Sequence, residues 1–216
     1  MKRSRLRRQK LKEAKNPINL ILVRHGETEF NRQRLILGHG PEPLNDKGQA
    51  QALSAAVAVS KDTPFVLYAS PLARTIQTAE AIASESSVDL TPMPGLEEID
   101  AGDMEGLTGR DLQERYPEVM RVWRTDPASA MMPDGESLGN VQNRAWSAIT
   151  DIAQRHIDDT VVVVSHNFPI QAILCKALGI PLNNFRQLRV DLGSITRMEV
   201  RDSIFTLLSL NETWHL

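Results

Sequence analysis

Two of the five histidines in this chain follow short apolar runs of the kind that form buried strands. Arg24 and His25 come after the run at 18–23, and His166 comes after the run at 160–165. A single histidine at the end of a strand is more often structural than catalytic. Two such histidines, one with an arginine beside it, favour a functional site for an anionic substrate.

Arg74 adds a second guanidinium to this group of residues. It falls in the first turn of a helical pattern that follows a third apolar run, at 65–69. A guanidinium presents a fork of donors that matches phosphate oxygens, and a neutral imidazole is a nucleophile that forms a labile bond to phosphorus. These residue types therefore predict chemistry on a phosphoryl group, with helix N-termini as further anion-binding donors.

Other nucleophiles and metal chemistry find less support in the sequence. It contains no P-loop pattern, no HExxH and no other metal-ligand spacing, so we expect neither a metal nor a cofactor. Cys175, the rival nucleophile, lies in the middle of a helical pattern with no glycine-rich anion loop beside it, and we interpret it as a core residue. We interpret His39, His156 and His215 as solvated or surface histidines.

The elements that must position these groups alternate between strand and helix patterns. Strands are expected at 18–23, 65–69, 160–165 and near 88–91, and two or three more between 188 and 210 with a turn near 201–202. Helices are expected after 44–46, at 70–84, 108–124 and 137–156, and from 166 to 178. This alternation is typical of an α/β sheet with helices on both faces. Because working groups gather at the carboxyl ends of strands in such sheets, the two histidines and two arginines should converge.

Two of the expected helices carry detailed predictions. Ala50, Leu53 and Val57 follow at spacings that place them on one apolar face of the first helix. Ser70 is expected to cap the second helix, with Pro71 at its first position.

Composition indicates a single domain in an ordinary globular chain. The 216 residues are 41% hydrophobic, with one cysteine, and hold neither an apolar signal-peptide core nor a run long enough to span a membrane. Residues 1–16 carry eight Lys or Arg and one Glu, against 17 basic and 26 acidic residues in the remainder. We expect a basic, flexible extension at 1–16, one domain over 17–216 and a cytoplasmic protein that contacts neither nucleic acid nor membrane.

The segment "LVRHGETEFN" at 22–31 resembles the signature of the histidine phosphatase superfamily, which contains cofactor-dependent phosphoglycerate mutases and many small phosphatases. The similarity extends over most of the chain from Asn19 to Leu210. It includes "RLILGHGPEPLNDKG" (34–48), "YASPLARTIQTAEAI" (68–82), "LEEIDAGDMEG" (96–106), "PDGESL" (133–138) and "VVVVSHNFPIQAIL" (161–174). The resemblance implies a three-layer α/β fold with a central, mostly parallel mixed sheet flanked by helices.

The resemblance also assigns roles to individual residues. His25 would be the nucleophile and would become a phosphohistidine. Arg24, Arg74 and His166 would bind the phosphoryl group and stabilise its charge in the transition state. Asn31 would donate a hydrogen bond to a phosphate oxygen.

A second group of residues takes supporting roles by the same resemblance. Glu98 would protonate the leaving oxygen and later deprotonate water, whereas Glu97 falls one place off the motif. Glu105 would close its loop by accepting hydrogen bonds from backbone N–H groups. Gly38 and Asn167 would lie in the phosphate-binding site.

The chain departs from the family pattern at three places. Asn167 stands where the family usually has glycine, and we expect its side chain to cap the following helix. Leu37 replaces a commonly polar residue, and "AGDMEG" (101–106) lacks the usual aromatic residues. These departures concern the choice of substrate more than the chemistry.

Three functions remain open at the level of sequence. Mutases of this family carry a longer insertion before the second histidine, whereas Glu98 and His166 are only 68 positions apart here. That interval favours net hydrolysis, and the loop at 34–44 resembles that of α-ribazole-phosphate and broad-specificity phosphatases. The primary prediction is a metal-independent phosphatase of a small phosphorylated metabolite. The alternatives are a phosphoglycerate mutase and a non-catalytic phospho-ligand-binding module.

Substrate specificity is expected to come from the segments at 39–42 and 110–132. The arginines of the second segment would either bind another anionic group of the substrate or form a solvated helix face; they are Arg110, Arg115, Arg121 and Arg124. The C-terminal strands could pair across a homodimer.

Overall fold

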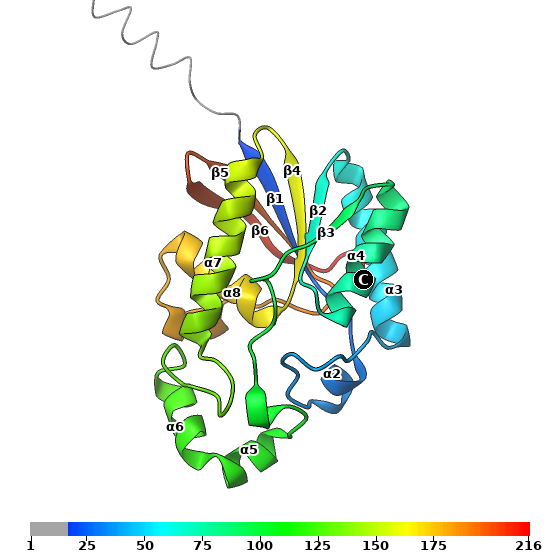
Figure 1. Cartoon of the computed structure of the whole chain (residues 1–216). Coiled ribbons are helices and arrows are strands. Elements are labelled where there is room, and N and C mark those ends of the chain that lie inside the picture. Colours follow the sequence, from blue (N-terminus) through cyan, green and yellow to red (C-terminus); the bar gives the residue numbers. More distant parts are fainter. Residues whose placement is uncertain (1–16) are drawn as a thin grey trace, which may run out of the picture.

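A six-stranded sheet lies at the centre of the computed structural model, which describes residues 17–216. Its strands are β1 Ile18–Arg24, β2 Val66–Ala69, β3 Leu90–Pro92, β4 Thr160–Ser165, β5 Ile195–Arg201 and β6 Ile204–Glu212. They lie in the order β3-β2-β4-β1-β5-β6 (Figure 1). The first four are parallel to one another, and β5 pairs antiparallel with both β1 and β6. The predicted mostly parallel mixed sheet is therefore confirmed.

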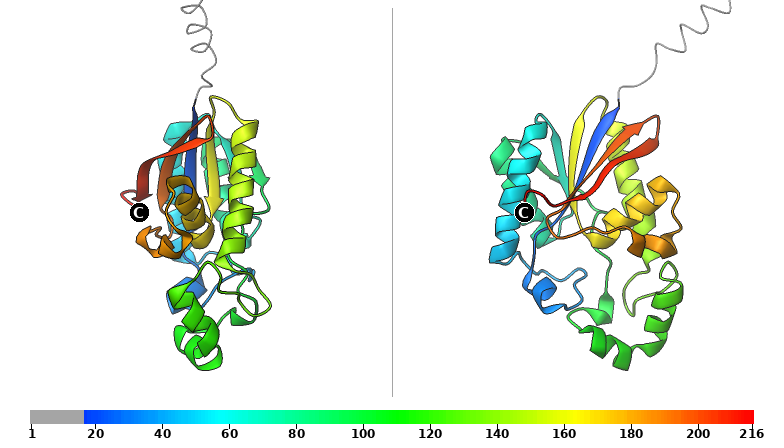
Figure 2. Two further views of the ribbon diagram at one scale, coloured as in Figure 1. Left: turned by 90° about the vertical axis from the view of Figure 1, so that its left-hand side faces the viewer. Right: turned by 180° about the vertical axis from the view of Figure 1, so that it is seen from behind.

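Helices cover both faces of this sheet, as predicted for a three-layer fold (Figure 2). They are α2 Glu29–Gln33, α3 Asp46–Val59, α4 Ala73–Ser86, α5 Gly109–Arg115, α6 Pro117–Thr125, α7 Leu138–Arg155 and α8 Asn167–Leu178. Short 3-10 turns occur at η1 Ser60–Asp62, η2 Gly102–Met104 and η3 Leu182–Gln187. The alternation of side chains along β1 accounts for the two cores. Leu20 and Leu22 pack towards α7 and α8, whereas Ile21 and Val23 pack towards α3 and α4.

The predicted apolar face of α3 is wrong. Leu53 is 62% exposed and Val57 is 53% exposed, so this face points to solvent. The helix instead buries mostly small side chains, at Ala52, Ala55, Ala56, Ala58 and Val59. Small residues let α3 approach α4 and the sheet closely, and a pattern search for large apolar side chains gives them too little weight.

The helix expected at 70–84 starts later than predicted. α4 begins at Ala73 after Leu72, which makes no side-chain capping bond. Ser70 and Pro71 therefore lie before the helix and do not hold the predicted cap and first positions. The Ser70 hydroxyl accepts from the N–H of Leu72 at 3.4 Å and lies 2.8 Å from Nε2 of His166. A serine after a strand can serve a neighbouring histidine as well as a helix end, and sequence does not distinguish these cases.

The helix expected at 108–124 is two helices, α5 and α6, that meet at Tyr116 and Pro117. Proline has no N–H to continue the helix and disfavours the helical conformation of the residue before it. By contrast, the predictions for α7 and α8 are confirmed. Ser137 forms a capping box at the start of α7, and Gly179 ends α8 with a φ of 67°.

The C-terminal hairpin turns at Asp202 and Ser203, close to the predicted position, whereas residues 188–194 form no strand. β6 forms one edge of the sheet, and a homodimer through it stays a prediction. The predicted basic extension lies outside the described residues.

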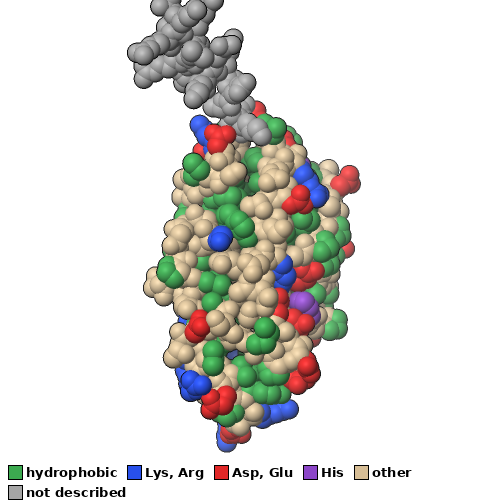
Figure 3. Space-filling model, turned by 60° about the vertical axis from the view of Figure 1, so that its left-hand side comes forward, with side chains coloured by type: hydrophobic (Ala, Val, Ile, Leu, Met, Phe, Trp, Pro, Cys, Tyr) green, Lys and Arg blue, Asp and Glu red, His purple; other side chains and the backbone are tan. Residues whose placement is uncertain are grey.

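The helices and the surface of residues 17–216 bear on the expected partners. None of these helices is both long and apolar enough to cross a membrane. Over the face seen in Figure 3, acidic and basic side chains are interspersed among apolar ones.

Candidate active site

The carboxyl ends of β1, β2 and β4 bring the predicted site residues together. β1 and β4 are parallel neighbours, and the N–H of His25 donates to the carbonyl of Ser165 at 3.1 Å. This places the ring of His25 against that of His166, with ring centres 5.0 Å apart and an angle of 61° between the planes. Arg74 reaches the same point from α4, with its Nε 3.3 Å from Nε2 of His25.

The hydrogen bonds of His25 define its tautomer. Nδ1 lies 2.7 Å from the carbonyl oxygen of Gly26, which can only accept, so Nδ1 carries the proton. Nε2 then holds the lone pair and accepts from Nε–H of Arg74. Burial, followed by the charges of Arg74 and Arg24, holds the pKa of His25 well below its usual 6.5. His25 is therefore a neutral imidazole with a nucleophilic nitrogen at neutral pH.

Gly26 allows the turn after His25 to pass close to the start of α3. A Cβ built on Gly26 would lie 2.3 Å from the carbonyl oxygen of Gly48, a contact that no side chain tolerates. The glycine of the signature thus keeps its own carbonyl in place to accept from His25.

Arg74 is completely buried and directs its guanidinium at the loop after α2. Its Nη2 donates to the carbonyl of Gly38 at 2.8 Å, and its Nη1 donates to that of Gly40 at 3.3 Å. Burial lowers the pKa of Arg74 to about 10, which leaves it charged at neutral pH. Within residues 17–216, no carboxylate forms an ion pair with Arg74 or Arg24. The site thus holds positive charge that a bound anion would neutralise.

Two buried nitrogen atoms at this site have no hydrogen-bond partner in the described part of the chain: Nε of Arg24 and Nδ1 of His166. Arg24 uses its Nη1 to donate to the carbonyl of Val190 at 2.7 Å, and His166 shares the hydrogen bond with Ser70 through Nε2. Burial, then the charge of Arg74, lowers the pKa of His166 well below 6.5. Unpartnered buried polar atoms are costly, and a phosphoryl group, with several acceptor oxygens, fits a site of this composition.

Glu98 is 5% exposed, and burial is the main reason why its pKa is raised above the usual 4.5. Its Oε1 accepts from the N–H of Ile99 at 2.9 Å and from that of Phe168 at 3.2 Å. A carboxyl with a raised pKa is suited to proton donation. The N–H of Phe168 belongs to the first turn of α8, where the sequence analysis expected donors for the phosphate, and it serves Glu98 instead.

The remaining predicted residues take defined positions. Glu105 accepts from the N–H of Gly38 through both oxygens, at 2.9 and 3.0 Å, which agrees with its predicted loop-closing role. The amide oxygen of Asn31 accepts from the N–H and hydroxyl of Thr28, so its amide nitrogen is the atom left to donate. The expected capping by Asn167 is wrong, because His166 holds the cap position and the Asn167 amide donates to Gln171 at 3.0 Å within α8.

The four arginines for which substrate binding and a solvated helix face both remained open make local contacts. Arg110 pairs with Glu114 and Arg121 pairs with Glu118, each within its own helix. Arg124 donates to the side chain of Gln113, and Arg115 lies over the ring of Tyr116. These contacts are those of a solvated helix face.

Two side chains hold the backbone of Glu98, a role that the sequence did not predict for either. His39 is exposed, as expected, but its Nε2 lies 2.8 Å from the carbonyl oxygen of Glu98. Arg144 of α7 donates to the same oxygen at 2.7 Å. His39 lies in the segment 34–48 that resembles the family and in the expected specificity segment 39–42. The nearest signal for Arg144 is the "PDGESL" motif, whose Glu136 pairs with it. Both side chains bind backbone carbonyls. Because every residue has a carbonyl, such contacts cannot be recognised from residue types in the sequence.

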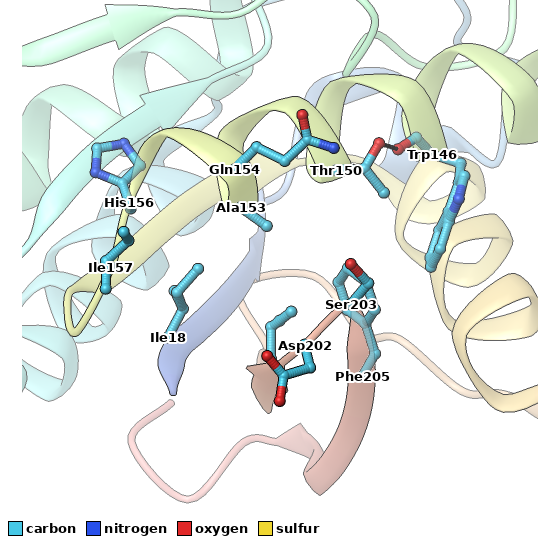
Figure 4. A pocket seen from close by; sticks show the side chains of 11 residues that line it. Ile18, Trp146, Thr150, Ala153, Gln154, His156, Ile157, Asp202, Ser203 and Phe205 are labelled. Carbon is cyan, nitrogen blue, oxygen red and sulfur yellow. Dashed lines mark hydrogen bonds between the residues drawn. The ribbon is translucent and has the colours of Figure 1, made fainter. Parts of the chain in front are cut away.

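A cavity of about 470 Å³ lies away from these groups, among α7, the start of β1 and the β5–β6 hairpin (Figure 4). Ile18, Trp146 and His156 are among its lining residues. Ile18 begins β1 whereas His25 follows its end, and none of the residues that converge around His25 lines this cavity. We therefore assign the chemistry to the carboxyl ends of the strands and not to this cavity.

Comparisons with known proteins show the family of the chain. Residues 20–213 match the profile of the histidine phosphatase superfamily, branch 1. The chain is 35% identical over 199 residues to phosphoserine phosphatase 1 of Hydrogenobacter thermophilus, covering 92% of this chain and 94% of that protein. It is 31% identical over 186 residues to a protein of Enterobacter sp. named "Probable phosphoglycerate mutase GpmB", covering 86% of each.

Solved structures show the same fold. The α-ribazole phosphatase from Shigella flexneri superposes with a TM-score of 0.81 at 28% identity, covering 90% of this chain and 96% of that one. The match over residues 20–213 and the extent of the similarity to these relatives show that the chain belongs to branch 1 of the histidine phosphatase superfamily.

Proposed function

We propose that this enzyme hydrolyses phosphate monoesters of small metabolites through a phosphohistidine on His25. The observation that carries the proposal is the lone pair on Nε2 of His25, held beside a buried guanidinium that has no carboxylate partner. In the first step, Nε2 forms a bond to phosphorus while the bond from phosphorus to the ester oxygen breaks. Glu98 gives its proton to that oxygen, and the alcohol leaves.

The second step returns the enzyme to its starting state. Glu98, now ionised, takes a proton from a water molecule, whose oxygen attacks phosphorus as the bond to Nε2 breaks. Inorganic phosphate leaves, and His25 is again neutral. Arg24, Arg74, His166 and the Asn31 amide would bind the phosphoryl oxygens in both steps, because positive charge and fixed donors stabilise the transition state more than the ground state.

Phosphoserine is the first substrate to test, because phosphoserine phosphatase 1 is a relative at 35% identity over nearly the whole of both chains. The mutase alternative has support from relatives at about the same level of identity. The short interval from Glu98 to His166 favours hydrolysis, since it leaves no room for the insertion that closes the pocket against water. We further propose a cytoplasmic location and catalysis without a metal.

A direct experiment measures inorganic phosphate released from phosphoserine and from a panel of phosphorylated sugars and hydroxy acids, with His25→Ala as the control. We expect turnover of at least one of these esters by the native chain and none by the variant. A parallel reaction with 3-phosphoglycerate and 2,3-bisphosphoglycerate tests the mutase alternative. Rapid formation of 2-phosphoglycerate without phosphate release would reverse our ranking, and phospho-ligand binding without any turnover would indicate the non-catalytic module.

A further inference from the structure

The backbone of Glu98 is held by side chains from two distant parts of the chain. Arg144 in α7 donates from Nη2 to the Glu98 carbonyl oxygen at 2.7 Å, and His39 in the loop after α2 approaches it with Nε2 at 2.8 Å. A carbonyl oxygen has two lone pairs and accepts both bonds. Since this oxygen can only accept, Nε2 of His39 carries a proton. Two donors therefore fix the position of the residue that carries the buried carboxyl.

Arg144 also holds the residues just before Glu98. Its Nη1 donates to the carbonyl of Gly95 at 3.0 Å and to that of Glu97 at 2.6 Å. One guanidinium thus bonds three carbonyls of the segment 95–98.

Glu136 completes the arrangement on the other side. It pairs with Arg144 through two hydrogen bonds, of 2.5 Å to Nη2 and 3.1 Å to Nε. Its Oε1 accepts from the N–H of Asp100 at 2.9 Å, and its own N–H donates to the carbonyl of Asp100 at 3.1 Å. The Arg144–Glu136 pair therefore holds the loop both before and after Glu98.

The geometry of this pair depends on arginine in particular. A guanidinium has five N–H donors in a rigid plane, and Arg144 makes five hydrogen bonds. Lysine has the same charge but places three donors on a single nitrogen, so it cannot reach these acceptors at once. The loop is thus fixed in orientation as well as in distance.

We propose that Arg144, Glu136 and His39 form a clamp that positions the carboxyl of Glu98 for proton transfer to the leaving group. The inference rests on the proposed function, in which Glu98 is the general acid. The side-chain hydrogen bonds of the clamp go to the segment around Glu98 and not to His25, Arg24 or Arg74. The charge of Arg144 also acts on His166, and a lysine at position 144 keeps that charge while it loses the hydrogen bonds. Displacing a reacting group by 1 Å can cost about 10²-fold in rate. Loosening the clamp should therefore slow those reactions that need the proton.

The leaving group separates this role from a merely structural one. An alkoxide is a poor leaving group and requires a proton as its bond breaks, whereas nitrophenolate leaves readily without one. Arg144→Lys should slow single-turnover release of glycerol from 2-glycerol phosphate by about tenfold or more, since it misplaces a positioned acid. Release of nitrophenol from p-nitrophenyl phosphate should change far less. Arg155→Lys is the matched control, because Arg155 lies exposed on the same helix and pairs only with Asp151 in the described contacts.

Glu98→Gln, alone and combined with Arg144→Lys, shows whether Arg144 acts through Glu98. If it does, the double variant releases glycerol no more slowly than Glu98→Gln alone. If Glu98→Gln slows both substrates equally, the proposed role of Glu98 is wrong. If Glu98→Gln is selective but Arg144→Lys is not, or if the two losses multiply, the clamp is wrong and the role of Glu98 stands.

His39 gives a second test that does not depend on folding, because its side chain is exposed. His39→Ala removes the donor and should slow glycerol release more than nitrophenol release. His39→Gln places an amide N–H within reach of the same carbonyl and should restore most of the rate. An equal loss for both substrates, no loss, or failure of glutamine to restore the rate would overturn the proposal, even if Arg144→Lys melts too early to be measured.

Discussion

His25 and His166 are buried as neutral imidazoles, and this makes the stability of the chain depend on pH. Each pKa is lowered from 6.5, mainly by burial, so between 6.5 and the folded value the unfolded chain binds protons that the folded chain does not. The free energy of unfolding should therefore be highest above that range and fall as the pH drops through it. The slope is at most about 1.4 kcal/mol per pH unit for each histidine.

Urea unfolding of the native chain and of His166→Gln, from about pH 7.5 to about pH 5.5, measures this effect. The variant should lose about half of the slope that the two histidines contribute. Glu98 changes the free energy of unfolding with pH in the opposite direction, because its pKa is raised in the folded chain. Since Glu98 is present in both the native chain and His166→Gln, its contribution cancels when their slopes are compared. Equal slopes in the native chain and His166→Gln would show that the pKa of His166 is the same in the folded and unfolded chains, which contradicts its burial as a neutral imidazole.

The protonation of Glu98 should also determine how the activity depends on pH. Its raised pKa keeps the proton in place above 4.5, and kcat/KM for an alkyl phosphate should fall as the pH rises through that raised value. Glu98→Gln should lower kcat/KM by about 10²–10⁴-fold and remove this alkaline decline. Both enzymes are measured with the same substrate, so ionisation of the phosphate affects both profiles alike. A variant with the native profile, merely scaled down, would count against Glu98 as the acid.

The loop after α2 connects the phosphate site to the segment that runs from Glu98 to Glu105. Gly38 accepts from Arg74 through its carbonyl and donates to Glu105 through its N–H. A Cβ on Gly38 would lie 2.6 Å from the carbonyl oxygen of Ile99 and 2.7 Å from the nitrogen of Ala101. These are backbone atoms that cannot turn aside, so the loop itself must move.

Gly38→Ala should therefore lower kcat/KM by about tenfold or more, because Arg74 loses its fixed acceptor and shifts relative to His25. Gly109→Ala is the matched control, since no atom lies within 4 Å of the Cβ position there. Steady-state kinetics of both variants test this. Native activity in Gly38→Ala would mean that the loop does not set the position of Arg74.

The elements that were predictable from the sequence are those specified by local chemistry. The run at 160–165, the cap at Ser137 and the glycine at 179 each act on their own segment, and the structure contains all three features. The α3 face was not predictable, because its alanines are buried only through the approach of α4. Arg144 and His39 were missed for a related reason: their partners are carbonyl groups of a distant loop.

We expect the whole chain to be active without a metal. No group of three or more histidine, cysteine, aspartate or glutamate residues in 17–216 is arranged to hold a metal ion. Positive charge at the site comes from Arg24 and Arg74. Dialysis against EDTA should therefore leave the phosphatase rate unchanged, measured by phosphate release before and after adding Mg²⁺ or Zn²⁺. If the rate is lost on dialysis and restored by either ion, a metal and not the arginines is the main source of positive charge at the site.

The central claim is that His25 carries the phosphoryl group between the two steps, and the fold supports it by burying a neutral imidazole with its lone pair on Nε2. The most direct measurement is an acid-free quench of the reaction with a phosphate-labelled substrate, followed by detection of label on the protein and peptide mapping. We predict label that is stable to base and labile to acid, located on His25 and absent from His25→Ala. Label that persists in His25→Ala, or that maps to Cys175, would contradict the account.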